Sequence, residues 1–129
     1  MVSDSPPTAA SPGLLLLLVD DDDMLRELMS AIFKSQGYRV MTASNGEDAL
    51  RSLSHQRPDA IVLDWQMPIM TGEEFLTMPS VKALGAAVPI LVCSAYEGSF
   101  PPEVQVLRKP FESATILARL LSMLRARTA

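Results

Sequence analysis

Four consecutive aspartates, Asp20 to Asp23, stand between an apolar run and a helix-like pattern in the stretch LVDDDDML. A further aspartate, Asp64, ends a second apolar run in DAIVLDWQMP. Carboxylates within about 4–6 Å of one another repel, which raises the pKa of some of them unless a cation is present. Mg²⁺ prefers a site with one or two carboxylates, several waters and a phosphate oxygen. If the two apolar runs are neighbouring strands, these residues therefore predict a site for a divalent cation.

The aspartate run also has a purely structural interpretation. An Asp in front of a helix commonly caps its first turn, and acids within that turn complement the helix dipole. Asp22 and Asp23 fit this role, and Asp64 could be a simple turn residue. Because Asp64 ends a different apolar run, with Pro68 and Gly72 shaping the next loop, the combination favours a metal site more strongly than the aspartate run alone.

Two more polar residues end apolar runs, Ser94 in ILVCS and Lys109 in VLRKPF. An ammonium group at such a position is a point charge suited to phosphate oxygens, and a hydroxyl could bind the same anion. Taken singly, Lys109 could be a solvated surface residue and Ser94 a turn residue. Together with the acids, they indicate phosphate chemistry.

Residues this far apart in the chain act together only if the fold carries them to one place. Five apolar runs of strand length mostly lack the alternation of a sheet with one exposed face, which is typical of strands buried on both faces. These runs are Leu14–Val19, Tyr38–Ala43, Ala60–Leu63, Ile90–Cys93 and Val104–Leu107. Helical patterns lie between them, so we expect an α/β fold with a parallel sheet and functional groups at the carboxyl ends of its strands.

Spacing and capping signals locate the helices. Apolar residues recur at i, i+3, i+4 and i+7 in the first and last helices, at Leu25, Leu28, Met29 and Ile32 and at Leu117, Leu120, Leu121 and Leu124. Ser44 with Glu47 and Thr71 with Glu74 fit capping boxes, which predict helix starts near residues 45 and 72.

The connection Ala95–Glu103 does not suit a helix. It contains Gly98, Pro101 and Pro102, and it is shorter than the about 10–12 residues that a parallel crossover usually takes. We expect a stunted helix or an irregular loop between the fourth and fifth strands.

Composition narrows the class of protein further. The length of 129 residues suits one domain, and a net charge of −4 argues against a surface for nucleic acid. A lone cysteine, Cys93, matches a reducing compartment, so the cytoplasm is the expected location, and its apolar neighbours suggest a buried residue. The run Leu14–Val19 is too short to span a membrane. Residues 1–13 are rich in Pro, Ser and Ala and are interpreted as a flexible leader, which leaves residues 14–127 as the domain.

Five stretches together resemble the receiver domain of response regulators, the family that takes a phosphoryl group from a phosphohistidine of a sensor kinase in two-component signalling. In the family's order these stretches are LLVDDDDMLRELM, GYRVMTASNGEDAL, PDAIVLDWQMPIMTGEEFL, ILVCSAY and LRKPF. The chain is similar to the single-domain, chemotaxis-regulator-like members. This resemblance implies a doubly wound, flavodoxin-like, five-stranded parallel sheet with strand order 2-1-3-4-5. Here the fourth helix, between strands four and five, is expected to be shortened or missing.

The resemblance also implies a role for each site residue. Asp64 takes the position of the phosphoacceptor, and Asp20 and Asp21 take that of the acidic pair, in which Asp21 is the better direct ligand of Mg²⁺. The backbone carbonyl of Gln66 completes the protein ligands. Ser94 occupies the family's hydroxyl position, and Lys109 that of its lysine.

Three positions bear on the phosphorylated state rather than on its formation. Gln66 and Tyr96 occupy variable positions that, in similar domains, modulate how fast the acyl phosphate is lost. Val106 stands where the family usually has an aromatic residue, three positions before the lysine. The usual coupling between hydroxyl and aromatic ring therefore cannot operate in its ordinary form.

The resemblance implies a phosphoacceptor signalling domain rather than a turnover enzyme, although such domains promote their own phosphorylation and dephosphorylation. Its expected partners are a sensor histidine kinase or a histidine phosphotransfer protein and an unknown downstream protein, with no direct contact to nucleic acid or membrane. One alternative is a pseudo-receiver that acts as an interaction scaffold without phosphorylation. An aspartate-nucleophile phosphatase ranks last, because such enzymes usually carry a second acid where this chain has Gln66.

Overall fold

A five-stranded parallel sheet organises the computed structural model, which describes residues 13–127. The strands are β1 (Leu15–Val19), β2 (Arg39–Ala43), β3 (Ala60–Asp64), β4 (Ile90–Ser94) and β5 (Gln105–Arg108). They lie in the order β2-β1-β3-β4-β5, and every neighbouring pair is parallel. The predicted doubly wound sheet with strand order 2-1-3-4-5 is therefore confirmed. The predicted leader, residues 1–13, lies outside the described residues except for Gly13.

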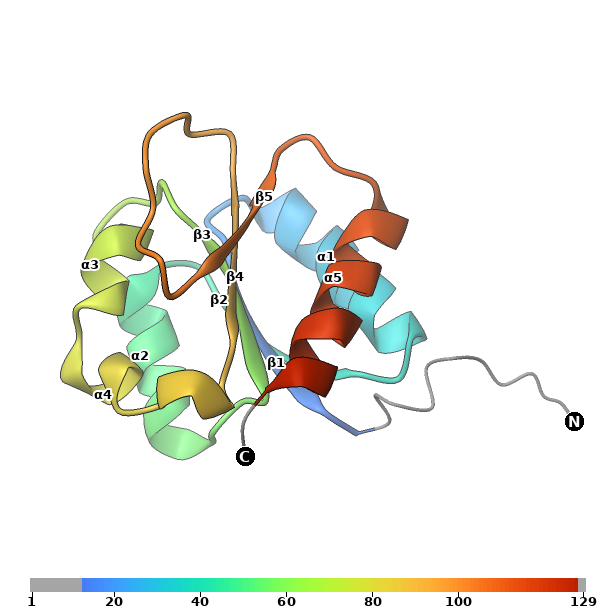
Figure 1. Cartoon of the computed structure of the whole chain (residues 1–129), viewed down its shortest axis with the longest axis horizontal. Coiled ribbons are helices and arrows are strands. Elements are labelled where there is room, and N and C mark those ends of the chain that lie inside the picture. The colour runs from blue at the N-terminus through green and yellow to red at the C-terminus, as the bar shows by residue number, and fades with distance from the viewer. Residues whose placement is uncertain (1–12, 128–129) are drawn as a thin grey trace, which may run out of the picture.

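Helices cover both faces of the sheet (Figure 1). On one face are α1 (Asp23–Ser35) and α5 (Ser113–Ala126), and on the other are α2 (Gly46–His55), α3 (Gly72–Leu76) and α4 (Pro79–Lys82), with the short 3₁₀ helix η2 (Gly85–Ala87) before β4. Leu16 and Leu18 pack into the half of the core that contains Phe33 of α1, whereas Leu17 and Val19 pack into the half that contains Trp65. This alternation follows from the two-residue period of a strand. None of the helices within residues 13–127 has the length and apolar character needed to cross a bilayer.

The helix starts show which predicted caps form. Thr71 and Glu74 make the predicted capping box at α3. The box predicted for Ser44 and Glu47 is wrong, because Asn45 caps α2 by accepting the N–H of Asp48 at 2.9 Å. Asn is as good a cap as Ser, so the residue directly before the first helical turn takes the role.

The connection from β4 to β5, residues 95–104, contains no helix in the described structure. It rises beyond the carboxyl ends of the strands and returns to begin β5 (Figure 1). The helix labelled α4 precedes β4 and belongs to the previous crossover. The prediction that the helix between strands four and five would be shortened or missing is confirmed.

The lone cysteine is part of the core. Cys93 lies in β4 and is 2% exposed. Burial raises the pKa of its thiol to about 12, so the thiol stays protonated and unreactive at neutral pH. The prediction of a buried residue is confirmed.

Asp59 links the beginning of β1 to the residue after α5 through hydrogen bonds. Its Oδ2 accepts the N–H of Leu15 at 2.7 Å, and its Oδ1 accepts a hydrogen bond from Arg127 Nη1 at 3.0 Å. The first strand and the last helix are therefore joined at the end of the sheet opposite the carboxyl ends of the strands.

Ile69, in the loop after β3, adopts a backbone conformation that strains it. Its φ is 71°, and a β-branched residue in this left-handed region costs about 1–2 kcal/mol, whereas Gly adopts it freely. The residue is 69% exposed, so a smaller one loses little burial. We expect Ile69→Gly to raise the free energy of unfolding by about 1 kcal/mol once the greater entropy of unfolded Gly is subtracted. Urea unfolding measures this change, and Ile69→Ala, which keeps the strained Cβ, should show no such gain.

Candidate functional site

Three aspartate side chains meet at the carboxyl ends of two neighbouring strands. Asp20 and Asp21 directly follow β1, Asp64 ends β3, and β1 and β3 are paired with Val19 opposite Leu63. One carboxylate oxygen from each aspartate can be chosen so that all lie within 4.8 Å of one another. Asp20 is buried and Asp21 is exposed, so the cluster lies at the boundary between the core and the surface.

The other two aspartates of the run lie outside this cluster. Asp22 caps α1 by accepting the N–H of Leu25 at 3.1 Å, and Asp23 pairs with Arg26 at 2.6 Å within the first turn. The structural interpretation is therefore confirmed for Asp22 and Asp23. Arg26 also donates to the backbone carbonyl of Asp20 at 2.6 Å, which holds the turn that presents the acids.

Lys109, the residue directly after β5, reaches the same cluster. Its Nζ lies 3.5 Å from Asp20 Oδ2 and 3.6 Å from Asp64 Oδ1. Burial acts to lower the pKa of Lys109, but the charges of Asp64 and Asp20 outweigh it and leave that pKa above its ordinary value. The ammonium group is therefore charged at neutral pH and partly balances the acids.

Asp64 is the acid whose protonation is most affected by its surroundings. Burial raises its pKa to about 6, the charges of Asp20 and Asp21 add to this rise, and the Lys109 charge opposes it. Three carboxylates with one ammonium leave a net negative site at neutral pH. A cation bound there would relieve the repulsion.

The donor set fits a hard divalent cation. Carboxylate oxygens are the ligands that Mg²⁺ prefers, and neither a thiol nor an imidazole belongs to the cluster. Asp20, Asp21 and Asp64 are the residues that would hold such an ion.

Ser94 lies one strand away from Asp64. Asp64 is paired with Cys93 across β3 and β4, so Ser94 stands one residue further toward the carboxyl edge. The residue is 1% exposed, and its Oγ accepts the N–H of Tyr96 at 2.9 Å. The Lys109 N–H donates to the Ser94 carbonyl at 3.0 Å, which ties the two predicted site residues together.

The remaining predicted residues lie in the segments around the cluster. Gln66 is exposed, two residues after Asp64, and Tyr96 is exposed in the β4–β5 connection. Val106 is partly buried in β5, against the half of the core that contains Trp65.

Close backbone packing fixes the loop after Asp64. The Trp65 N–H donates to Asp64 Oδ1 at 2.9 Å, and the Gly72 N–H donates to the Trp65 carbonyl at 2.9 Å. A Cβ at Gly72 would lie 2.8 Å from the Asp64 carbonyl oxygen, so a larger residue there would push the loop away. The sequence indicated that Gly72 shapes this loop, but it did not predict these contacts.

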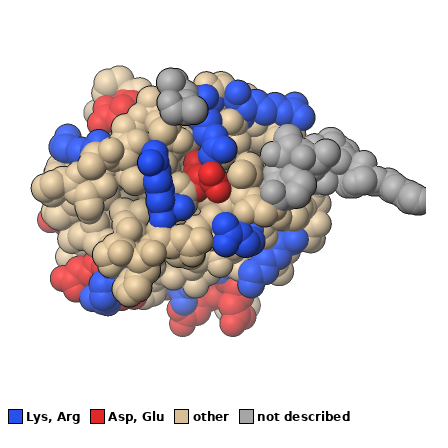
Figure 2. Space-filling view, turned by 90° about the horizontal axis from the view of Figure 1, so that it is seen from below, with Lys and Arg blue, Asp and Glu red and all other residues tan. Residues whose placement is uncertain are grey.

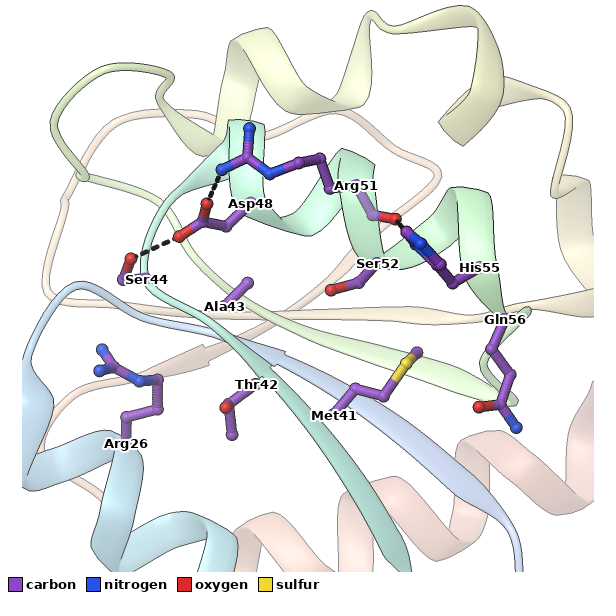
Figure 3. A pocket seen from close by; sticks show the side chains of 10 residues that line it. All are labelled: Arg26, Met41, Thr42, Ala43, Ser44, Asp48, Arg51, Ser52, His55 and Gln56. Carbon is purple, nitrogen blue, oxygen red and sulfur yellow. Dashed lines mark hydrogen bonds and ion pairs between the residues drawn. The ribbon is translucent and has the colours of Figure 1, made fainter.

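A separate hollow of about 610 Å³ lies along the edge strand β2 between α1 and α2 (Figure 3). None of the predicted site residues lines it. Its charged groups pair locally, since Arg51 contacts Asp48 and the His55 ring donates to the Arg51 carbonyl at 2.8 Å. The chemistry-bearing residues are therefore concentrated at the aspartate cluster.

The fold and the site together define a class of protein, and a family model confirms it. The model described as the response regulator receiver domain matches residues 16–121, and the chain belongs to this family. Over 99 residues the chain is 39% identical to the transcriptional regulatory protein PrrA of Mycobacterium tuberculosis, covering 70% of this chain and 41% of the relative. The chain thus spans about two fifths of the length of that curated relative.

Solved structures show the same fold. The receiver domain of the sensor histidine kinase PA1611 from Pseudomonas aeruginosa, which has a magnesium ion coordinated in its active site cleft, is 28% identical with a TM-score of 0.75, covering 88% of this chain and 99% of that one. The chemotaxis protein CheY4 of Vibrio cholerae is 30% identical with a TM-score of 0.72, covering 86% and 98%.

Proposed function

We propose that residues 14–127 form a phosphorylatable receiver domain in which Asp64 accepts a phosphoryl group in a Mg²⁺-dependent reaction that switches partner binding. The observation that carries this proposal is the meeting of three carboxylates within 4.8 Å with an ammonium group 3.6 Å from Asp64. One ammonium group does not balance three carboxylates, which leaves negative charge that a divalent cation would neutralise. The magnesium ion of the PA1611 receiver domain supports the choice of cation.

The proposed transfer is an in-line displacement at phosphorus. A new bond forms between an Asp64 carboxylate oxygen and phosphorus while the bond from phosphorus to the donor's histidine nitrogen breaks, and the histidine leaves with that electron pair. The Lys109 ammonium stabilises charge that builds on the equatorial oxygens. Mg²⁺, when held by Asp20, Asp21, Asp64 and the Gln66 carbonyl, supplies positive charge that lets two anions approach. Catalysis is then mainly positioning and electrostatics, as expected of a signalling domain without turnover of a small substrate.

Ser94 supplies the change that follows phosphorylation. Its hydroxyl is buried one strand from Asp64, and we expect it to donate to an oxygen of the new phosphoryl group. The turn of the Ser94 hydroxyl toward the phosphoryl group would favour one of two conformations of the nearby surface. Gln66 and Tyr96 flank the site and would set how long the acyl phosphate lasts.

The partners follow from this chemistry. We infer a cytoplasmic phosphohistidine donor, either a sensor histidine kinase or a histidine phosphotransfer protein, and a downstream protein that recognises the phosphorylated state. At the end of the molecule drawn in Figure 2, Lys and Arg side chains form separate groups rather than one continuous stripe. The face drawn there thus lacks the continuous basic stripe that is typical of a nucleic-acid surface.

Exposed apolar residues on α1 suit the docking of a protein donor. Met24 is 82% exposed and Leu28, one turn further along α1, is 58% exposed, and α1 begins directly after the aspartate cluster. We expect the double change Met24→Ser and Leu28→Ser to slow phosphotransfer from a phosphohistidine protein about tenfold, because apolar contact area is lost. Labelling by a small phosphodonor should be unchanged in the same variant. Equal slowing with both donors would place the effect in the chemistry instead.

The raised pKa of Asp64 predicts how Mg²⁺ binding depends on pH. Protons compete with the ion for the carboxylate, so below about pH 6 the affinity should fall about tenfold per pH unit, with a plateau above. Without metal, the raised pKa means that the native state binds this proton more tightly than the unfolded chain. Its stabilising contribution is therefore present below about pH 4 and is lost as pH rises to about 6. Calorimetric titration and urea unfolding measure the two effects, and both should vanish in Asp64→Asn.

The test of the proposed function is labelling by a small phosphodonor such as acetyl phosphate, with and without Mg²⁺. We expect a phosphoryl group that hydroxylamine removes, as it does from an acyl phosphate, and that forms only with the ion. A chain that takes up neither a phosphoryl group nor beryllofluoride would support the pseudo-receiver alternative. The replacement of the usual aromatic by Val106 and the missing β4–β5 helix favour that alternative.

A further inference from the structure

A cluster of three aromatic rings joins the β4–β5 connection to the loop after β3. The Phe100 ring lies edge-on to the Trp65 ring, with centroids 5.0 Å apart, and edge-on to the Tyr96 ring at 5.6 Å. Edge-on pairs at these distances are attractive beyond the apolar area that they bury. Phe100 therefore links a ring buried beside the phosphorylation site to an exposed ring at the surface.

Both outer members of this aromatic cluster, Trp65 and Tyr96, are hydrogen-bonded to site residues. The Trp65 N–H donates to Asp64 Oδ1 and the Tyr96 N–H donates to Ser94 Oγ, each at 2.9 Å. The Tyr96 carbonyl accepts from Arg108 Nη1 at 2.7 Å. The cluster thus connects the Asp64 carboxylate to the Ser94 hydroxyl without involving position 106.

Phe100 belongs to the same half of the core as Val106, the β5 position that lacks an aromatic side chain. Phe100 and Val106 are both partly buried against the half of the core that contains Trp65. The connection bends tightly enough to bring Gly98 against the Tyr96 ring, and a Cβ at Gly98 would collide with that ring. The irregular connection therefore supplies the ring that the strand does not.

We propose that Phe100 is the positioning residue that couples Asp64 phosphorylation to the surface, and that residues 95–104 are the segment that moves. This inference rests on the proposed function. When the Ser94 hydroxyl turns toward a phosphoryl oxygen, its Oγ leaves the Tyr96 N–H. Tyr96 then shifts, its contact with Phe100 opens, and the connection moves away from Trp65. The exposed face of the aromatic cluster becomes the surface that distinguishes the two states.

The rival explanation is a small satellite cluster that only closes a long connection. Such a cluster would respond to its own mutation but not to events at Asp64. The two explanations therefore differ in whether Trp65 becomes more accessible when Asp64 carries a phosphoryl mimic.

The experiment uses the full chain with Mg²⁺ and beryllofluoride, and follows Trp65, the chain's only tryptophan, by acrylamide quenching. Fluorine NMR reports independently whether beryllofluoride is bound. We expect the quenching constant to rise about two- to threefold on binding, as a buried indole becomes accessible, and Mg²⁺ alone to leave it unchanged.

Two variants test the role of Phe100. Phe100→Leu keeps the apolar volume but removes both ring contacts, so quenching should already be high and should no longer respond to beryllofluoride. Because coupling is reciprocal, beryllofluoride should bind this variant about 2- to 10-fold more tightly. Gly98→Ala displaces the Tyr96 ring without removing any aromatic group and should shift both readouts the same way, by less. Phe111→Leu, a matched change of a partly buried Phe in the other half of the core, should keep the wild-type response.

The possible failures are distinguishable. Absence of a bound-beryllofluoride signal in the wild type would overturn the proposed function itself, and the inference with it. Bound beryllofluoride with unchanged Trp65 quenching would overturn the coupling and leave the proposed function standing. A full wild-type response in folded Phe100→Leu would show that another residue carries the signal.

Discussion

Asp64→Asn should abolish Mg²⁺-dependent labelling by a small phosphodonor. The amide keeps the size of the side chain and its contact with the Trp65 N–H, but it is not a nucleophile toward phosphorus and is a poorer ligand of Mg²⁺. Labelling should fall below detection, and the hydroxylamine-labile phosphoryl group should be missing from the intact mass.

Folding should not explain this loss. Asp64 is a partly buried acid repelled by Asp20 and Asp21, so its neutral replacement should leave the metal-free domain at least as stable at pH 7. Asp23→Asn, which changes an aspartate outside the cluster, should label like the wild type. Labelling of Asp64→Asn at the wild-type rate would assign the acceptor to another residue.

Lys109→Ala should slow phosphotransfer by about 10²–10³-fold, the usual effect of removing one preorganised charge from a transition state. The loss arises because Nζ lies 3.5 Å from Asp20 and 3.6 Å from Asp64, where it faces the developing charge. Mg²⁺ should bind as tightly as before or more tightly, because a positive charge has left the cation site. Single-turnover labelling at saturating Mg²⁺ measures the rate, and calorimetry measures the affinity.

Lys82→Ala supplies the control for a lysine removed elsewhere, since Lys82 is exposed in α4. Its labelling rate should equal that of the wild type. Unfolding of Lys109→Ala is measured with Mg²⁺ present, because the buried Asp20 carboxylate loses its cationic partner. A Lys109→Ala rate within threefold of the wild-type rate would remove the lysine from the proposed mechanism.

The strands and their convergence could be predicted because they depend on local patterns. Apolar runs bounded by turn residues placed the strands to within about a residue or two, as the comparison of Val104–Leu107 with the observed Gln105–Arg108 illustrates. Parallel order then carried Asp20, Asp64, Ser94 and Lys109 to one edge.

The features that the sequence did not predict depend on choices that local patterns cannot make. Ser44 and Asn45 are adjacent and both suit a helix cap, so composition alone could not choose between them. The short helix α4 buries only Val81 and leaves little periodic signal. The contacts of Phe100 come from an irregular connection, where neither a two-residue nor a 3.6-residue period applies. The aromatic contacts beside the aspartate cluster were therefore not accessible to sequence reasoning.

The hydrogen bonds of Asp59 determine where further domains could be joined to the receiver domain in a longer polypeptide. Because the Asp59 carboxylate bonds to both Leu15 and Arg127, the first and last described segments of the domain lie next to each other. They lie at the end of the sheet opposite Lys109. A further domain joined at either end would lie at that end of the sheet, away from the aspartate cluster and Lys109. Both junctions would thus be separated by the length of the sheet from Asp64 and Lys109.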